Sequence, residues 1–286
     1  MNETHHEPLT VWRFIRRHFV RIGIGAVLVV AVYGVISIYA TFQREQRIAK
    51  EIRVHGGKVE FQYRGPNWIP QSMRDRTILF SRVTFLDLRN TQITDAGLGH
   101  LKELTSLVFL ELTNSQFNDA KLKHLKGLTN LRTLILDDQH VTDAGLQHLK
   151  GLRGLMYLTL HNTQVTDAGL EHLKGLANLT HLDLDLTHVT DAGLERLKGL
   201  TNLTILLLDS TQVTDAGLKH LKGLTNLVFL DLVDTQVTDA GLEHLKGLTK
   251  LEELKLHGTR TTEEGVEMLR EALPDCKIER DEWLSF

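Results

Sequence analysis

Histidine and aspartate, the side chains most often used for proton transfer and metal binding, recur in this chain at a regular interval. Six histidines share one position of a 24-residue period, which Arg196 interrupts: His100, His124, His148, His172, His220 and His244. His161 and His181 occupy other positions of the same period. Side chains that recur by repetition line up along a molecule, whereas the residues of a catalytic triad or a zinc site must converge on one point. We therefore expect no enzyme activity, no cofactor and no metal site. The weaker alternative is a hydrolase, for which His161, His181 and the acids near them are the best candidates.

The period belongs to one repeated sequence unit that has a strand half and a helix half. Its most regular phrase, TDAGL, begins at Thr94, Thr142, Thr166, Thr190, Thr214 and Thr238, with divergent copies at Asn118 and Thr262. The pattern LxxLxL, as in Leu227, Leu230 and Leu232, stands ahead of each copy and predicts a short strand. Thr214 is a good N-cap for the helix that follows it, and Gly223 is expected to end that helical segment in the left-handed conformation. One unit cannot bury its own apolar face, so neighbouring units must stack.

Stacking strand on strand and helix on helix predicts a bent α/β solenoid. Parallel strands lie about 4.8 Å apart and packed helices about 8 to 10 Å apart, so parallel strands line the concave face and short helices the convex face. We assign eight repeats to residues 83–265 and a C-terminal cap to residues 266–286, in which Leu273, Cys276 and Ile278 repeat the strand pattern. Residues 42–82 are expected to form a helix that ends at Gly56–Gly57 and an N-terminal cap with a strand over Val59–Tyr63.

The N-terminal segment has a different composition and predicts a membrane anchor. Residues Ile22–Ala40 carry no charge, and a helix of that length spans about 28 Å, close to the thickness of a bilayer core. We assign residues 1–21 to a short cytoplasmic tail and residues 22–41 to one transmembrane helix, which makes the following helix juxtamembrane. Basic residues flank both ends of the span equally, so the orientation rests on the short tail and on the ease with which long domains cross. The protein is expected in the cell membrane as a single-pass protein, with the repeats outside the cytoplasm.

Charge and cysteine content narrow the classes of partner and chemistry. The formal net charge is only −3, so nucleic acid is not expected as a partner. Cys276 is the single cysteine, which excludes an intramolecular disulfide. Because Cys276 takes the place of a core leucine, we expect a buried and unreactive thiol.

The outward side chains of the strands form the surface that a partner would touch. One row along the sheet carries mainly aromatic and apolar residues, among them Phe85, Phe109, Tyr157, His181, Ile205 and Phe229. The neighbouring row carries acids, among them Asp87, Glu111, Asp183 and Asp231. Exposed aromatics anchor partners and acids favour basic residues on them, so we expect a protein ligand, with a glycan as the second choice. The alternative interpretation is that the acids only follow the repeat consensus and the aromatics only shield the sheet.

The full unit, LxxLxLxxTxVTDAGLxHLKGL, resembles the TDAGL type of bacterial leucine-rich repeat protein, and it is similar to the cysteine-containing leucine-rich repeats of F-box adaptors. The resemblance extends to a single membrane span ahead of the repeats, and it specifies the fold more strongly than the function. From the strand face itself we expect a membrane-anchored solenoid that recognises proteins noncovalently through its concave face. A structural cell-envelope spacer or lateral assembly unit without a specific soluble ligand is the alternative. Threonine stands where the F-box repeats have cysteine, so no ubiquitin-ligase role is carried over.

Overall fold

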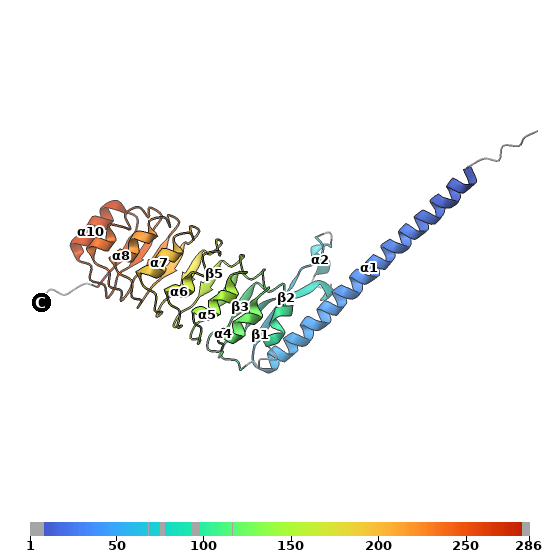
Figure 1. Cartoon of the computed structure of the whole chain (residues 1–286), viewed down its shortest axis with the longest axis horizontal. Helices are drawn as coiled ribbons and strands as arrows, with labels where there is room; N and C mark the ends of the chain where they lie inside the picture. The colour runs from blue at the N-terminus through green and yellow to red at the C-terminus, as the bar shows by residue number, and fades with distance from the viewer. Residues whose placement is uncertain (1–8, 68, 75–77, 93–97, 116, 282–286) are drawn as a thin grey trace, which may run out of the picture. The chain divides into compact units, whose positions relative to one another are not determined.

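The computed structural model describes residues 9–67, 69–74, 78–92, 98–115 and 117–281, and side chains from Val30 onward except at Ile78. The chain forms two compact units, and some of its helices and strands are labelled in Figure 1. The first unit comprises Met1–Arg47 and Tyr63–Ser81. The second unit holds the repeats and comprises Ile48–Gln62 and Arg82–Phe286.

A continuous helix, α1 (Leu9–Val54), contains both the expected membrane span and the expected juxtamembrane helix without a break between them. Gly56 has a φ of 86° just past the end of α1, as a C-cap requires. Among the residues with described side chains, no helix is both long and apolar enough to cross a membrane. Residues 22–29 of the expected span lie outside those described side chains.

The rest of the first unit is a turn-rich segment with the short helices α2 (Gln71–Arg74) and η1 (Ile78–Phe80). The Arg74 guanidinium lies 5.5 Å from the centre of the Tyr63 ring, and its Nε donates a hydrogen bond of 2.9 Å to the Ile69 carbonyl. The Tyr63 ring meets Phe80 edge-on, with 6.0 Å between ring centres. A cation and two aromatic rings therefore organise this segment.

In the sheet of the described residues, the order in space follows the order in sequence from β1 to β10. The strands are β1 (Lys58–Tyr63), β2 (Ser81–Asp87), β3 (Phe109–Glu111), β4 (Thr133–Ile135), β5 (Tyr157–Thr159), β6 (His181–Asp183), β7 (Ile205–Leu207), β8 (Phe229–Asp231), β9 (Glu253–Lys255) and β10 (Lys277–Glu279). From β2 onward the neighbours are parallel, and each pairing joins residues one period apart, such as Leu206 and Leu230. The predicted α/β solenoid with a parallel sheet is confirmed. The predicted register of the C-terminal cap is wrong, because Ile278 pairs with Leu254, where the LxxLxL pattern placed Cys276.

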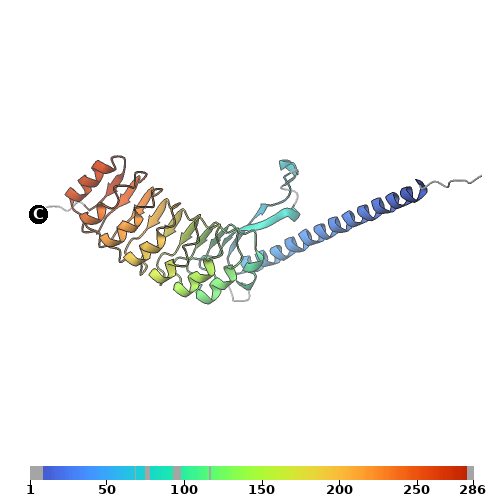
Figure 2. The same ribbon diagram turned by 45° about the horizontal axis from the view of Figure 1, so that its top comes forward.

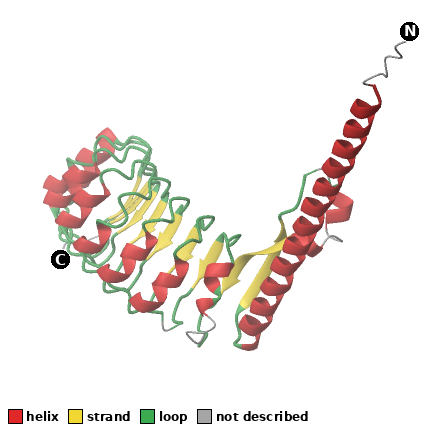
Figure 3. Ribbon diagram, turned by 45° about the vertical axis from the view of Figure 1, so that its right-hand side comes forward, coloured by secondary structure: helices red, strands yellow, loops and turns green. Residues whose placement is uncertain are grey.

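Short helices form the return half of each repeat, on the side opposite the strands (Figures 2 and 3). They are α4 (Asp119–Leu122), α5 (Asp143–Leu146), α6 (Asp167–Leu170), α7 (Asp191–Leu197), α8 (Asp215–Leu218), α9 (Asp239–Leu242) and α10 (Glu263–Ala272), with the 3₁₀ helices η2 (Leu101–Glu103), η3 (Lys123–Leu125), η4 (Gln147–Leu149) and η5 (Lys219–Leu221). Thr214 caps α8 as predicted, because its hydroxyl accepts from Ala216 N at 3.2 Å.

The predicted left-handed exit at Gly223 is wrong. The left-handed residue of that repeat is Ser210, with a φ of 54°, in the turn that follows β7. The same position is left-handed in neighbouring repeats, where it is held by Asn90, Asn114, Asp138, Asn162, Leu186 and Asp234. Asparagine and aspartate tolerate this conformation better than other residues with side chains, which accounts for most of the residue types found there.

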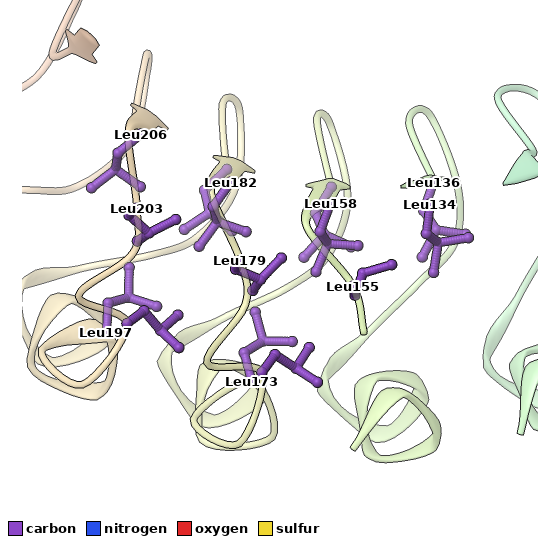
Figure 4. Packing of buried hydrophobic residues seen from close by; sticks show 14 of the residues in the cluster. Leu134, Leu136, Leu155, Leu158, Leu173, Leu179, Leu182, Leu197, Leu203 and Leu206 are labelled. Atoms are coloured by element: carbon purple, nitrogen blue, oxygen red, sulfur yellow. The ribbon is translucent and has the colours of Figure 1, made fainter. Parts of the chain in front are cut away.

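Leucines fill the space between the strands and the helices (Figure 4). The seven inward positions of the repeat that contains β7 are all 0% exposed: Leu203, Leu206, Leu208, Val213, Leu218, Leu221 and Leu224. Burying one such side chain contributes about 1.5 to 3 kcal/mol, and most of the sum is cancelled by the entropy of ordering the chain. Each repeat is therefore stable only against its neighbours.

A ladder of carboxylates joins the helical halves of successive repeats. Asp191, the first residue of α7, accepts hydrogen bonds from the backbone N of Thr214 at 2.8 Å and from its hydroxyl at 2.7 Å. Equivalent pairs run along the array: Asp119 with Thr142, Asp143 with Thr166, Asp167 with Thr190, Asp215 with Thr238 and Asp239 with Thr262. The Thr and Asp of TDAGL thus connect repeats as well as capping helices.

The glycine of TDAGL makes room for this ladder. A Cβ added at Gly217 would lie 2.4 Å from Asp191 Oδ1, the oxygen that accepts from Thr214 N. Gly217 does not have a positive φ, so its role is steric rather than conformational. Close approach of one repeat to the next explains why this position has no side chain.

Candidate functional site

The strand face consists of three rows of outward side chains, each with one residue per repeat. The aromatic row is Phe85, Phe109, Thr133, Tyr157, His181, Ile205, Phe229 and Glu253, and the acidic row is Asp87, Glu111, Ile135, Thr159, Asp183, Leu207, Asp231 and Lys255. Backbone pairing puts the members of each row directly beside one another, about 4.8 Å apart. A third row, which we call the turn row, follows the strands and includes Asp137, His161, Asp185 and Asp209.

The aromatic row is divided into separate pairs. Phe85 and Phe109 stack with 4.4 Å between ring centres, and Tyr157 stacks on His181 at 4.8 Å. Phe229 lies under a cation, the Lys255 Nζ, which is 5.1 Å from the centre of its ring. Stacking leaves both rings of the Phe85 pair half-buried, whereas Tyr157 is 39% exposed. The middle of the row therefore presents the most accessible ring.

The carboxylates near both ends of the acidic row are bound by other groups of the same chain. Asp87 is buried and accepts from Arg89 Nε at 3.1 Å, with Lys58 Nζ 3.4 Å away, and the Arg89 hydrogen bond lowers the pKa of Asp87. Glu111 is also buried and accepts from the Thr113 hydroxyl. Asp231 accepts from the backbone N of Val233 at 3.0 Å and lies 3.5 Å from Lys255 Nζ. These acids are already neutralised or hydrogen-bonded.

Among the described residues, no lysine or arginine forms an ion pair with the acids in the middle of the face. Burial raises the pKa of Asp137 and of Asp183, and nearby carboxylates add to the effect on Asp183. Burial, followed by the repulsion of Asp183, raises the pKa of Asp185 to about 7. Negative charge is therefore concentrated between β5 and β7, beside the Tyr157–His181 pair, and a cationic group would stabilise it.

The expectation that histidines and acids do not converge is wrong at this point. Ligand atoms of His161, Asp183 and Asp185 lie within 4.8 Å of one another, and all three residues are half-buried. His161 and Asp185 are one period apart in the turn row, and Asp183 ends β6 in the next row. Sequence analysis treated each row separately, so it missed a cluster built from two rows and two repeats.

Sequence analysis also missed a groove that runs along the N-terminal ends of the strands. Its volume is about 800 Å³, and its lining includes Met156, Thr180, Asn202 and Lys250. Asn202 donates from Nδ2 to the Ala177 carbonyl at 2.8 Å, and the same bond recurs one period away from Asn226 to Thr201. The recurrent asparagine before the first leucine of LxxLxL is the sequence signal that could have indicated it.

Comparison with known proteins identifies the repeat. One family model, described as leucine rich repeat, matches residues 129–189, and a second with the same description matches residues 83–101 and 223–246. The chain therefore contains leucine-rich repeats over these residues. These matches concern leucine-rich repeats in general and not the TDAGL type. No curated protein sequence matches the chain.

Solved structures of other leucine-rich repeat proteins share the fold. Internalin C2 from Listeria monocytogenes is 28% identical, with a TM-score of 0.58, over 72% of this chain and 87% of that one. The internalin inlF from the same organism is 24% identical, with a TM-score of 0.51, over 68% of this chain and 58% of its own. A leucine-rich repeat protein from Leptospira interrogans is 23% identical, with a TM-score of 0.52, over 63% of this chain and 45% of its own. Leucine-rich repeat domains generally serve as scaffolds for protein–protein interaction.

Proposed function

We propose that this leucine-rich repeat protein binds a protein partner noncovalently on its strand face while α1 anchors it in the cell membrane. The observation that carries the proposal is the Tyr157–His181 pair at the middle of the face, which combines an exposed aromatic surface with the adjacent carboxylates of Asp183 and Asp185. Aromatic side chains on a rigid surface are typical anchors for a partner. All ten residues proposed from the sequence lie in the aromatic and acidic rows.

The charge distribution favours a partner that brings basic side chains to the middle repeats. Lys58, Arg89 and Lys255 compensate acids near the ends of the rows, so a Lys or Arg of the partner gains less there. The pKa of Asp185, in contrast, is raised mainly by burial and further by the carboxylates around it. A basic side chain placed against Asp183 and Asp185 relieves this repulsion, which makes β5 to β7 the preferred contact region.

Anchoring rests on the uncharged segment Ile22–Ala40 and on the exposed apolar side chains in the second half of that segment. Val30 and Tyr33 are each 71% exposed, and Val35 and Ile36 are 61% and 57% exposed. Such a run of exposed apolar side chains is stable in contact with lipid. We propose a single span with the repeats outside the cytoplasm, so protease added to intact spheroplasts should digest the repeats. Protection of the repeats from the protease would place them in the cytoplasm instead.

Site-specific photo-crosslinking in the native membrane tests the partner-binding role. A photoreactive residue at Thr133, in the aromatic row, should capture a distinct protein that the same residue at His148, on the helical side, does not capture. Replacing Tyr157 and Phe229 by Ala in the Thr133 background should abolish the capture. Met268→Ala removes a side chain that is 45% exposed on α10 and is the matched control, which should capture normally.

The alternative role is a structural spacer or lateral assembly unit. Crosslinks from Thr133 that join only copies of this chain would support that role and reject recognition of a different protein. Capture that survives the Tyr157 and Phe229 replacements would instead show that the strand face is not the contact surface.

A further inference from the structure

His161, Asp183 and Asp185 have the residue types and the proximity of a metal-ligand set. One ring nitrogen of His161 and one carboxylate oxygen from each aspartate lie within 4.8 Å of one another. Ligands of a tetrahedral zinc ion are about 3.3 Å apart, since each bond is about 2.0 to 2.2 Å long. Because all of these atoms lie within 4.8 Å of one another, no pair has to approach by more than about 1.5 Å to reach that separation.

The backbone holds these residues in place and leaves ligand atoms free. Asp183 Oδ1 accepts from Asp185 N at 2.9 Å, and Asp185 Oδ1 accepts from Asp209 N at 2.7 Å. Each bond orients a carboxylate while its second oxygen stays available. The backbone N of His161 donates to Asp137 Oδ1 at 3.2 Å, and no described residue forms a hydrogen bond with the His161 ring. Three metal-ligand atoms with free lone pairs therefore lie close to one another.

A buried hydroxyl beside the cluster is an independent indication of a ligand. Thr159 is 6% exposed, and its Oγ1 makes no hydrogen bond of regular geometry with any described residue. Thr159 pairs in register with Asp183 and precedes His161 by two residues, so its side chain points to the same face of the sheet as both. The hydroxyl also lies near the Asp137 carboxylate. A metal-bound water would give this buried oxygen a hydrogen bond of regular geometry.

Local charge also favours a cation. Asp137, Asp183 and Asp185 are three partly buried carboxylates from neighbouring repeats. Near the ends of the face, lysine and arginine side chains compensate the acids, whereas none contacts this cluster among the described residues. A divalent cation would stabilise the charged form of the carboxylates.

We propose that His161, Asp183 and Asp185 bind a divalent transition-metal ion, with Zn²⁺ the best fit, through one imidazole nitrogen and two carboxylate oxygens. Mg²⁺ and Ca²⁺ prefer sites made only of oxygens, so the imidazole selects against them. Three protein ligands leave one tetrahedral position for water. The evidence for the site does not depend on the proposed partner, since it consists of the geometry, the hydrogen bonds and the charges of residues within this chain.

Calorimetric titration of the full chain with Zn²⁺, after treatment with EDTA, tests the site. Wild type should bind one Zn²⁺ much more tightly than Mg²⁺ or Ca²⁺. His161→Asn and Asp185→Asn should each weaken this binding by more than about 100-fold, because losing a direct ligand costs more than losing a supporting residue. His148→Asn removes a histidine from the helical side and is the matched control, which should bind Zn²⁺ like wild type.

Co²⁺ provides a second readout that does not depend on the size of the affinity loss. Visible absorption of the Co²⁺-loaded chain should report nitrogen ligation in wild type, and His161→Asn should change that spectrum. Circular dichroism in EDTA should show that the variants fold. Zn²⁺ binding that persists in His161→Asn and Asp185→Asn, or that falls equally in His148→Asn, would overturn the proposal by assigning the ion to the other histidines.

Discussion

Gly217→Ala tests whether the glycine of TDAGL exists to let repeats approach one another. In an isolated helix, alanine is more favourable than glycine by about 0.8 to 1 kcal/mol, so the substitution would stabilise α8 if only helix propensity mattered. The added Cβ would lie 2.4 Å from Asp191 Oδ1, and that carboxylate is held by Thr214 N at 2.8 Å and by the Thr214 hydroxyl at 2.7 Å. Relieving the clash therefore requires breaking the ladder.

The expected loss of stability follows from those two hydrogen bonds. Each bond to a charged group contributes about 1.5 to 3 kcal/mol, and the lower value suits this partly buried pair, which gives about 3 kcal/mol for the two. After the gain in helix propensity, Gly217→Ala should destabilise the chain by about 2 kcal/mol, as overpacking typically does. Gly223→Ala is the matched control: a Cβ there meets nothing within 4 Å, so stability should stay constant or rise slightly.

Urea unfolding of the full chain in mild detergent, followed by circular dichroism, measures these differences from the shift of the midpoint at constant m-value. Asp191→Ala removes the carboxylate and should itself cost about 3 kcal/mol. In that background Gly217→Ala should cost little, which gives a coupling of about 2 kcal/mol or more in the double-mutant cycle. If Gly217→Ala is as stable as Gly223→Ala, or if the two substitutions are additive, the ladder does not explain the glycine.

Two further predictions concern titratable groups. Burial raises the pKa of the Cys276 thiol to about 11, so a thiol reagent at pH 8 should modify the folded chain much more slowly than the urea-unfolded chain, and equal rates would contradict its burial. The pKa of Asp185 rises from 3.8 to about 7 on folding, so its contribution to stability is present below about pH 4 and is lost as the pH rises through 7. With EDTA present, the free energy of unfolding of Asp185→Asn should therefore rise relative to that of wild type by about 1 to 2 kcal/mol between pH 4 and pH 8, a value reduced for solvent screening. A parallel pH dependence of the two free energies would refute this.

Most of the repeat architecture was predictable because it depends on periodicity. The LxxLxL pattern specifies which side chains point inward, and leucines such as Leu206 are fully buried. Identical spacing in every unit then sets the pairing of the strands, as Leu206 with Leu230 shows. The helix start at Thr214 and the burial of Cys276 follow from the same local rules. A regular repeat carries this information in each unit separately.

Contacts between rows and between repeats were not predictable in the same way. Alternation places Tyr157 and Asp183 on the outward face but gives no distance between them and their neighbours. Stacking of Phe85 on Phe109 and the ion pair of Asp87 with Arg89 both depend on side-chain rotamers. For this reason the sequence suggested a continuous exposed stripe, whereas the structure has separate pairs and acids that are already bound.

The sequence by itself determined the period, the strand and helix halves of each unit and the order in which the units stack, because these depend on the spacing of apolar residues along the chain. Tertiary structure alone decided which polar residues meet, since His161 and Asp185 come within reach only when one repeat lies against the next. It also explains why residue 217 is a glycine, because Asp191 of the preceding repeat lies where a side chain would be. Such contacts join residues about one period apart through side-chain conformations that a sequence pattern does not specify.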